Sequence, residues 1–191
     1  EAHYSVPLAG GVLVPINTRL SSSEIAYILH HSGAKVLCVD TELAYLIRPI
    51  RAQLPQLETL INIVDGEYGE GLDGPDYETW LASGTDVLLD KPVEDENAPL
   101  SINYTSGTTG NPKGVLYTHR SAYLNALDAM LEMGVNSRST YLWTLAMFHC
   151  NGWCFTWGVT AVRATHVCRR RLDPAEVFRL IADESVSHMC G

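Results

Sequence analysis

One segment of the chain, from Tyr104 to Val115, has the residue types needed to hold a polyphosphate. It contains three glycines, four Ser and Thr hydroxyls and one lysine: Gly107, Gly110, Gly114, Thr105, Ser106, Thr108, Thr109 and Lys113. Closely spaced glycines allow a sharp turn whose successive backbone N–H groups form an anion-binding concavity. The hydroxyls add hydrogen-bond donors, and the lysine adds a mobile positive charge. The segment therefore predicts phosphate binding.

Two better-known phosphate loops do not match this segment. A Walker A loop requires Ser or Thr directly after its lysine, whereas Gly114 follows Lys113 here. The Gly-x-Gly-x-x-Gly pattern of dinucleotide-binding proteins is absent as well. The structural alternative is a glycine-rich hairpin turn with incidental hydroxyls. The Pro112-Lys113-Gly114 sequence, with a strand-like stretch on each side, favours phosphate binding.

The elements that must position this loop are a strand over 100–104, a strand over 115–117 and a helix over 119–133 that ends at Gly134. The rest of the chain alternates in the same way. Helices are predicted over 21–31, 41–51, 77–83, 151–162 and 173–183, and strands over 35–39, 60–64, 141–144, 165–168 and 186–189. Such alternation predicts an α/β fold with a largely parallel sheet.

The negative charge is concentrated in one stretch. The chain of 191 residues has a net charge of −9, and residues 65–96 contain eleven acidic residues against one basic residue, Lys91. The glycines and prolines of this stretch indicate a solvated surface excursion with a short helix near 77–83. A metal-binding acidic loop is the alternative, but the spacing fits no EF-hand. No large basic face is present, which argues against nucleic acid as a partner.

Five cysteines make an odd number, and the simplest interpretation is reduced thiols in a cytoplasmic protein. A zinc site near His149, Cys150 and Cys154 is the alternative, but there is no Cys-x-x-Cys pair and no second cluster to complete four ligands. No apolar run approaches the ~18 residues that a transmembrane helix needs.

The segment Tyr104–Val115 closely resembles the AMP-binding signature of the adenylate-forming superfamily, which includes acyl-CoA synthetases, peptide-synthetase adenylation domains and firefly luciferase. Gly11–Asn17 resembles a strand that precedes the nucleotide region in this superfamily. Met147–Trp153 resembles the next core motif, in the form typical of short- and medium-chain acyl-CoA ligases and plant-type acyl-activating enzymes. The resemblance covers nearly the whole chain.

The resemblance implies an acyl-CoA ligase, which uses ATP and Mg²⁺ to convert a carboxylic acid to an acyl-adenylate and then transfers the acyl group to CoA, as in fatty acid metabolism. It implies a set of residues around the β- and γ-phosphates: Thr105, Ser106, Gly107, Thr108, Thr109, Gly110 and Lys113. It also implies that Thr105 contacts the Mg²⁺ shell. His149 matches a catalytic residue that lines the junction of the acyl and adenylate groups, and Trp153 would line the acyl pocket. The structural alternatives are a satisfied His149 and a core Trp153.

Several features of this superfamily are not matched. Ala146 stands where these ligases usually have proline, which would loosen the loop that carries His149. No Tyr-Gly-x-Thr-Glu segment follows, and the hinge and the C-terminal catalytic lysine are missing. We therefore expect residues 1–191 to be an incomplete N-terminal AMP-binding domain, inactive alone and lacking the C-terminal catalytic domain.

Two other functions stay open at this point. One is the adenylation domain of a peptide synthetase, and the other is a non-catalytic nucleotide-binding fragment. The expected partners are a small carboxylic acid and CoA, and a homodimer is compatible with the sequence. The sequence does not name the acid, although the motif at His149 favours a short, medium or aryl acid over a long chain.

Overall fold

The fold is described from a computed structural model, which covers residues 1–66, 69–87, 92–105 and 110–191. The chain divides into two compact units, and each is described by itself. The first unit consists of Glu1–Pro15, Lys91–Asn103 and Leu116–Gly191, and the second unit consists of Ile16–Asp90 and Tyr104–Val115. Both mix helices with parallel strands, as predicted. No helix among the described residues is long and apolar enough to cross a membrane.

The second unit is built on two parallel strands, β1 (Val36–Asp40) and β2 (Thr59–Ile63), paired from Val36 opposite Thr59 to Asp40 opposite Ile63. Helix α2 (Ser22–Ser32) packs its apolar side into their core. The buried residues of this core are Ile25, Leu29, Val39, Ile47, Ile50, Leu54, Leu57 and Leu60. Helix α2 begins with the predicted capping box, in which Ser21 Oγ accepts from the Glu24 N–H and Glu24 accepts from the Ser21 N–H.

The single helix predicted over 41–51 is wrong. The structure has a 3₁₀ turn η1 (Thr41–Leu43), a short α-helix α3 (Ala44–Ile47) and a second 3₁₀ segment η2 (Arg48–Gln53). Pro49 supplies the physical reason, because it has no N–H to donate and its ring clashes with the carbonyl four residues earlier. The backbone therefore tightens into 3₁₀ turns around the proline.

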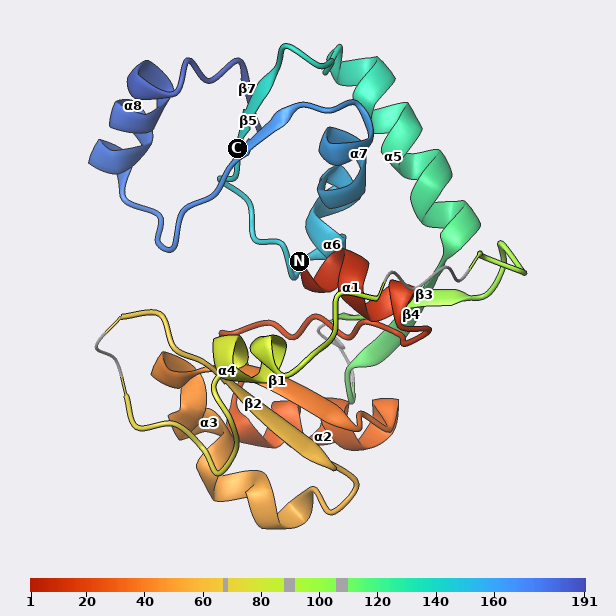
Figure 1. The fold of residues 1–191 in the computed structure, drawn as a ribbon, viewed down its shortest axis with the longest axis vertical. Coiled ribbons are helices and arrows are strands. Elements are labelled where there is room, and N and C mark those ends of the chain that lie inside the picture. The colour runs from red at the N-terminus through yellow and green to blue at the C-terminus, as the bar shows by residue number, and fades with distance from the viewer. Residues whose placement is uncertain (67–68, 88–91, 106–109) are drawn as a thin grey trace. The chain divides into compact units, whose positions relative to one another are not determined.

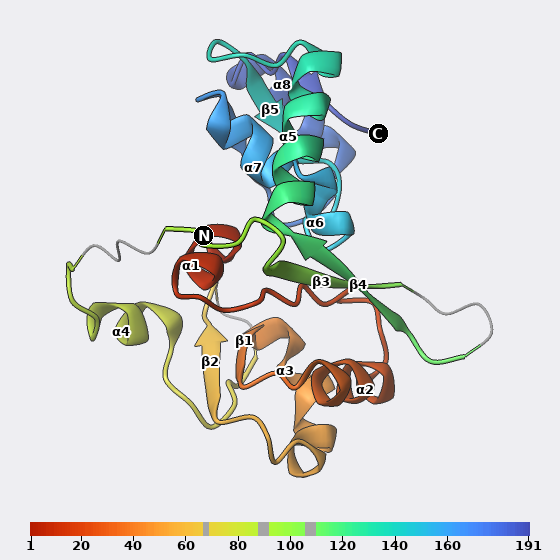
Figure 2. The same cartoon turned by 90° about the vertical axis from the view of Figure 1, so that its right-hand side faces the viewer.

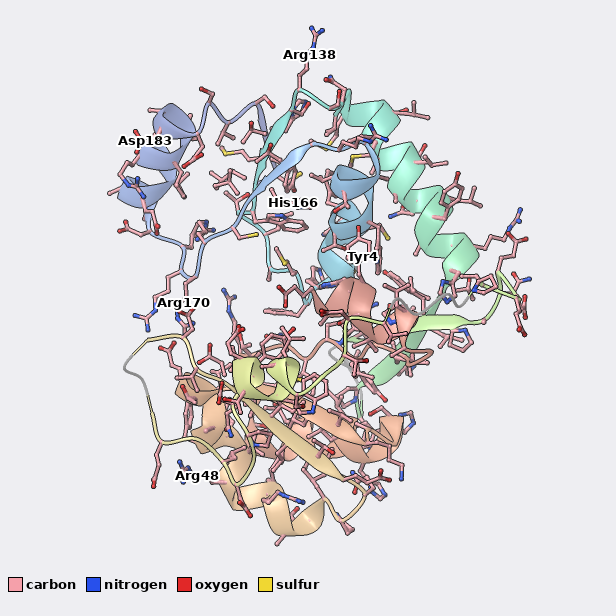
Figure 3. The ribbon with its side chains drawn as sticks, in the orientation of Figure 1. Tyr4, Arg48, Arg138, His166, Arg170 and Asp183 are labelled. Atoms are coloured by element: carbon pink, nitrogen blue, oxygen red, sulfur yellow. The ribbon has the colours of Figure 1, made fainter. Side chains whose placement is uncertain are left out.

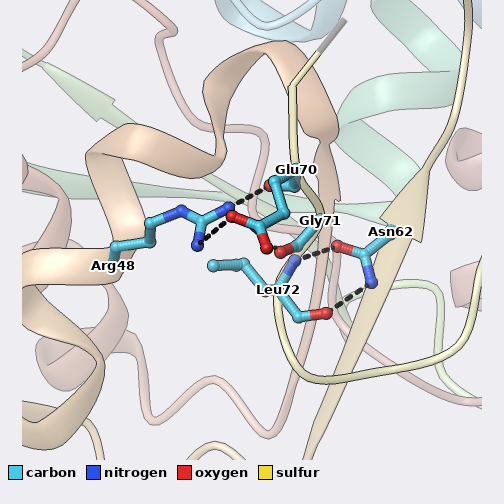
Figure 4. A network of polar contacts seen from close by, with 5 residues as sticks. All are labelled: Arg48, Asn62, Glu70, Gly71 and Leu72. Atoms are coloured by element: carbon cyan, nitrogen blue, oxygen red, sulfur yellow. Dashed lines mark hydrogen bonds and ion pairs between the residues drawn. The ribbon is translucent and has the colours of Figure 1, made fainter. Parts of the chain in front are cut away.

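Two side chains, of Asn62 and Arg48, hold part of the acidic stretch against the rest of the second unit (Figure 4). Asn62, which is buried on β2, accepts from the Leu72 N–H at 2.7 Å and donates to the carbonyls of Leu72 and Gly74 at 3.0 and 2.9 Å. Arg48 donates to the carbonyls of Glu70 and Gly71. The short helix α4 (Tyr77–Ala82) follows and lies close to β2. Most described residues over 65–96 are exposed, but residues 70–76 are tied to the core.

The first unit contains a three-stranded parallel sheet in the order β6-β5-β7. Its strands are β5 (Thr140–Leu142), β6 (Thr165–Val167) and β7 (His188–Met189). Helices α5 (His119–Met133) and α7 (Phe155–Ala161) lie side by side (Figures 1 and 2), and α8 (Pro174–Asp183) packs through Leu180 against Leu142 and Val167. Helix α1 (Ala2–Leu8) was not predicted.

The sequence signals at the ends of α5 and α8 are confirmed. Helix α5 begins at His119, with the Thr118 hydroxyl accepting from the Ser121 N–H, and ends at Gly134, whose φ of 64° is left-handed. Helix α8 begins with Pro174 directly after Asp173, whose carboxylate accepts from the Ala175 N–H.

Strands β3 (Pro99–Thr105) and β4 (Lys113–Thr118) are hydrogen-bonded neighbours and contribute residues to both units. They flank the predicted phosphate loop, and both were predicted from the sequence. Within the first unit, Leu13 pairs in parallel with Ser101 of β3. The strand predicted around Gly11–Asn17 is therefore a single bridge.

Candidate functional site

The predicted phosphate loop starts and ends on strands. Thr105 is the last residue of β3 and Lys113 is the first residue of β4. Strand β3 changes along its length from buried at Leu100 and Ser101 to exposed at Thr105, so the strand runs from the core to the surface at the start of the predicted loop. Gly110 and Lys113 are also exposed. The other predicted loop residues, Ser106, Gly107, Thr108 and Thr109, lie outside the described residues.

The residue before this loop is anchored by a side-chain hydrogen bond within the second unit. The Tyr104 hydroxyl and His31 Nδ1 lie 2.8 Å apart, and the His31 ring stacks on Tyr27 with ring centroids 5.4 Å apart. Partial burial raises the pKa of the Tyr104 hydroxyl above its usual range. Helix α2 therefore fixes the position at which the loop leaves β3.

His149 lies in a tight turn between β5 and α6 (Cys150–Trp153), and it is exposed. Its N–H donates to the Ala146 carbonyl at 3.2 Å, and its carbonyl accepts from the Gly152 N–H at 2.8 Å. The turn therefore closes on Ala146 although proline, the usual residue there in similar ligases, is absent.

The helix predicted over 151–162 is wrong, because the chain breaks into α6 and α7. Cys150, Gly152, Trp153 and Cys154 all have left-handed backbones, with φ of 48°, 58°, 56° and 64°. An ordinary helix cannot contain such residues, so Trp153 does not lie one right-handed turn beyond His149. The Trp153 side chain is 55% exposed, and its carbonyl accepts from Asn125 at 3.4 Å.

The half-buried Tyr117 is a neighbour of two thiols of this turn, Cys150 and Cys154. Burial, with Cys150 and Cys154 as neighbours, raises the pKa of Tyr117 to about 12. Burial also raises the pKa of the Cys154 thiol. Both groups therefore stay protonated at neutral pH. Among the described residues, no group of three or more His, Cys, Asp or Glu side chains could hold a metal ion.

The candidate residues divide between the two units. Thr105, Gly110 and Lys113 belong to the second unit, whereas His149 and Trp153 belong to the first. The two units expose different chemical groups. The second unit presents a hydroxyl and a cation at the two ends of a glycine-containing loop, which suits a phosphate chain. The first unit presents an exposed imidazole on a turn that two backbone hydrogen bonds close.

Sequence reasoning missed two kinds of contact around these residues. His31 and Tyr104 are 73 positions apart, and no local pattern connects them. Trp143, which packs against Gly152, was predicted only as part of a strand. An aromatic residue a few positions before a turn gives no signal of its own, since most buried aromatics serve packing alone.

Comparison with known proteins gives a consistent match over the full chain. The family described as AMP-binding enzyme matches residues 1–191. An acetate–CoA ligase, CCL3, of Humulus lupulus is 41% identical over 205 residues, which cover 100% of this chain and 36% of that protein. A peroxisomal benzoate–CoA ligase of Arabidopsis thaliana is 40% identical, covering 100% of this chain and 35% of that protein.

Solved structures agree with these relatives. The N-terminal domain of FACL13 from Mycobacterium tuberculosis, with an inhibitor bound, has a TM-score of 0.84 and 31% sequence identity, covering 98% of this chain and 45% of that chain. The chain spans about a third of the length of the curated relatives that it matches. Because the match extends from the first residue to the last, the chain belongs to the family of AMP-binding enzymes.

Proposed function

We propose that the protein containing this chain is an acyl-CoA ligase that activates a carboxylic acid with ATP. In the first step, a carboxylate oxygen attacks the α-phosphorus of ATP, the bond to the β-phosphate oxygen breaks, and pyrophosphate leaves. In the second step, the sulfur of CoA attacks the acyl carbonyl, the bond to AMP breaks, and the thiol proton is lost to a base or to water. The products are acyl-CoA, AMP and pyrophosphate.

The observation that carries this proposal is the phosphate loop on β3 and β4. Lys113 and the hydroxyls of Thr105, Ser106, Thr108 and Thr109 would bind the β- and γ-phosphates, with the backbone at Gly107 and Gly110 approaching them closely. Exposed Thr105 and Lys113 support this role, as does Gly110, where an added Cβ would meet no atom within 4 Å. Charge accumulates on pyrophosphate as it leaves, so these donors would stabilise the transition state.

Mg²⁺ fits this site only if the phosphate oxygens of the nucleotide supply ligands as well. Among the described loop residues, the Thr105 hydroxyl is the one side-chain oxygen at the end of β3. Mg²⁺ keeps several water ligands and prefers phosphate oxygens with few protein ligands. Thr105 would therefore contact the hydrated ion, whose charge neutralises the phosphate chain when it is bound.

On the acyl side, we assign His149 to the reacting carboxyl group and Trp153 to the acyl chain. An exposed imidazole on a closed turn suits the first role, and an exposed indole that must be covered by something apolar suits the second. The acid itself stays open, because similar proteins are named for acetate, benzoate and butyrate. The predicted cytoplasmic location and homodimer stay predictions, and several of these relatives are named as peroxisomal.

The test uses the full-length protein and a panel of acids from acetate to octanoate with benzoate and cinnamate. Each acid is assayed for exchange of labelled pyrophosphate into ATP and then for acyl-CoA formation. We expect at least one acid to support both reactions. Exchange without CoA-dependent thioester formation would indicate an adenylation domain of the peptide-synthetase type. Failure of exchange with every acid, in a protein that still binds ATP, would indicate a non-catalytic nucleotide-binding module.

A further inference from the structure

The turn that carries His149 is an unusual piece of backbone. Three of its residues, Cys150, Trp153 and Cys154, are not glycine and yet have left-handed backbones. Such conformations persist only where the surrounding structure holds them in place. The hydrogen bonds within the turn join His149 to Ala146 and Gly152, and these alone do not select a left-handed path. Something packed against the turn must do so.

That support is the indole of Trp143, which is 4% exposed. A Cβ added at Gly152 would lie 2.7 Å from Cζ3 and 2.9 Å from Cη2 of Trp143, which is too close for any side chain. Two features therefore require glycine at position 152: its φ of 58°, and the indole, which fills the space that a Cβ would need. Because the Gly152 N–H binds the His149 carbonyl, the indole edge sets the position of the turn that carries His149.

The indole is itself fixed by His166 of β6, which is labelled in Figure 3. Trp143 Nε1 donates to His166 Nδ1 at 3.0 Å, and the two rings are tilted by only 4° with centroids 6.0 Å apart. The parallel ring planes and this hydrogen bond together fix the orientation of the indole against His166. The Trp143 backbone N–H also binds the Val167 carbonyl at 3.0 Å.

A second bond on the other side of the ring selects one form of His166. His166 Nε2 and Thr160 Oγ1 lie 2.9 Å apart, and Thr160 Oγ1 donates its own proton to the Thr156 carbonyl at 3.1 Å. An indole N–H can only donate, so Nδ1 of His166 must accept. One neutral tautomer, with the proton on Nε2, satisfies all three bonds.

We infer that Trp143 and His166 are positioning residues for His149: His166 orients the indole of Trp143, and the indole holds the left-handed turn at Gly152. The inference rests on the role proposed above for His149. It assigns control over the acid-activating step to the buried Trp143 and the half-buried His166, neither of which touches substrate. Binding of ATP through the phosphate loop should be unaffected by it.

The experiment compares two substitutions of His166 in the full-length enzyme. His166→Asn keeps an acceptor, because the asparagine side-chain oxygen lies where Nδ1 of histidine lies. His166→Leu has similar bulk and no acceptor. We expect His166→Leu to lower kcat for acyl-CoA formation about tenfold with the KM for ATP changed by less than about twofold, since small misplacements of reacting groups are costly. His166→Asn should restore kcat to within about twofold of the wild type.

The matched control is His188→Leu. His188 lies on β7, on the opposite side of β5, and faces the same residue, Tyr141, in the strand register. It loses comparable hydrogen bonds, to Ser187 and the Met133 carbonyl, but is not bonded to Trp143. We expect His188→Leu to keep the wild-type kcat. Equal losses of kcat in His188→Leu and His166→Leu would overturn the inference, as would equal losses in His166→Asn and His166→Leu.

A measurement on the wild-type protein covers the case in which His166→Leu does not fold. In protein labelled with ¹⁵N-histidine and ¹⁵N-tryptophan, the Nδ1 resonance of His166 should be that of an unprotonated nitrogen. The indole N–H of Trp143 should show a hydrogen-bonded shift. A proton on Nδ1 at neutral pH would overturn the inference. If the wild type makes no acyl-CoA with any acid, the proposed function fails; if it does and His166→Leu matches it, only this inference fails.

Discussion

The two candidate segments of the chain are held in place in different ways. The phosphate loop is fixed at its two ends, by β3 with the Tyr104 anchor and by β4, and its described residues Thr105, Gly110 and Lys113 face solvent. The His149 turn is fixed from beneath, by a buried indole pressed against Gly152. A substitution in the loop should therefore act mainly on ligand binding, whereas a substitution in the turn should act on the folded structure as well.

A pair of glycine substitutions should give the largest contrast. In Gly152→Ala, the new Cβ clashes with Trp143 and takes a left-handed backbone, so we expect the free energy of unfolding to fall by roughly 2–4 kcal/mol. In Gly110→Ala the Cβ meets open space, so stability should change by less than about 1 kcal/mol. Urea denaturation of the full-length proteins measures both. Equal stability losses would show that the two segments are not held differently.

The next contrast separates two exposed lysines of the second unit. Lys113→Ala should lower kcat/KM for ATP in pyrophosphate exchange at least about 100-fold, because it removes a charge that stabilises the leaving pyrophosphate. Lys35→Ala is the control, since Lys35 forms a surface ion pair with Glu58 at 2.8 Å. It should change kcat/KM by less than about twofold. Unchanged exchange in Lys113→Ala, with normal folding, would remove Lys113 from the proposed site.

A smaller effect is expected at the anchor of the phosphate loop. Tyr104→Phe removes the hydroxyl that meets His31, which should cost about 1 kcal/mol of stability and raise the KM for ATP about threefold. Tyr45→Phe serves as the control, because the Tyr45 side chain is 64% exposed in the same unit. Thermal unfolding and steady-state kinetics provide the readouts. An unchanged KM for ATP in Tyr104→Phe would mean that the hydrogen bond to His31 is not needed to position the loop at the end of β3.

The smallest effect concerns pH and the support of the His149 turn. Burial lowers the pKa of His166 below its ordinary value of 6.5, so the unfolded chain takes up a proton there more readily than the folded protein. The stability that His166 contributes is therefore complete above pH 6.5 and declines as the pH falls below it. His3, whose pKa burial lowers to about 4, acts in the same direction. Unfolding of wild type and His166→Asn, measured from pH 7.5 to 5, should diverge as the pH falls, with the wild type losing more.

Local sequence signals predicted helices α2, α5 and α8, because their ends depend on neighbouring residues, whereas the phosphate-binding role of the loop stays a prediction. The caps at Ser21, Thr118 and Asp173 act over three positions or fewer, and the bounds of α2, α5 and α8 follow from the sequence around them. The AMP-binding signature is contiguous. It therefore identifies the family without any contact between distant residues.

The parts that could not be predicted depend on contacts between distant residues. The breaks at 41–53 and 150–154 arise from Pro49 and from left-handed residues around Gly152. The proline was visible in the sequence, but only packing explains why Cys150 and Trp153 adopt positive φ. The bonds of Trp143 to His166 and of His31 to Tyr104 join positions 23 and 73 residues apart, so no periodicity reveals them.

The hydrogen bonds of Asn62 to residues 72–75 have a consequence for aggregation of the protein in solution. Strand β2 pairs with β1 along one edge. Along its other edge, the Asn62 backbone N–H donates to the Pro75 carbonyl, and Asn62 forms a parallel bridge with Asp76. Its side-chain amide binds the same segment at Leu72 and Gly74. An open strand edge can recruit another chain and start aggregation, and here a short acidic cover lies along that edge instead. Asn62→Leu would uncover it.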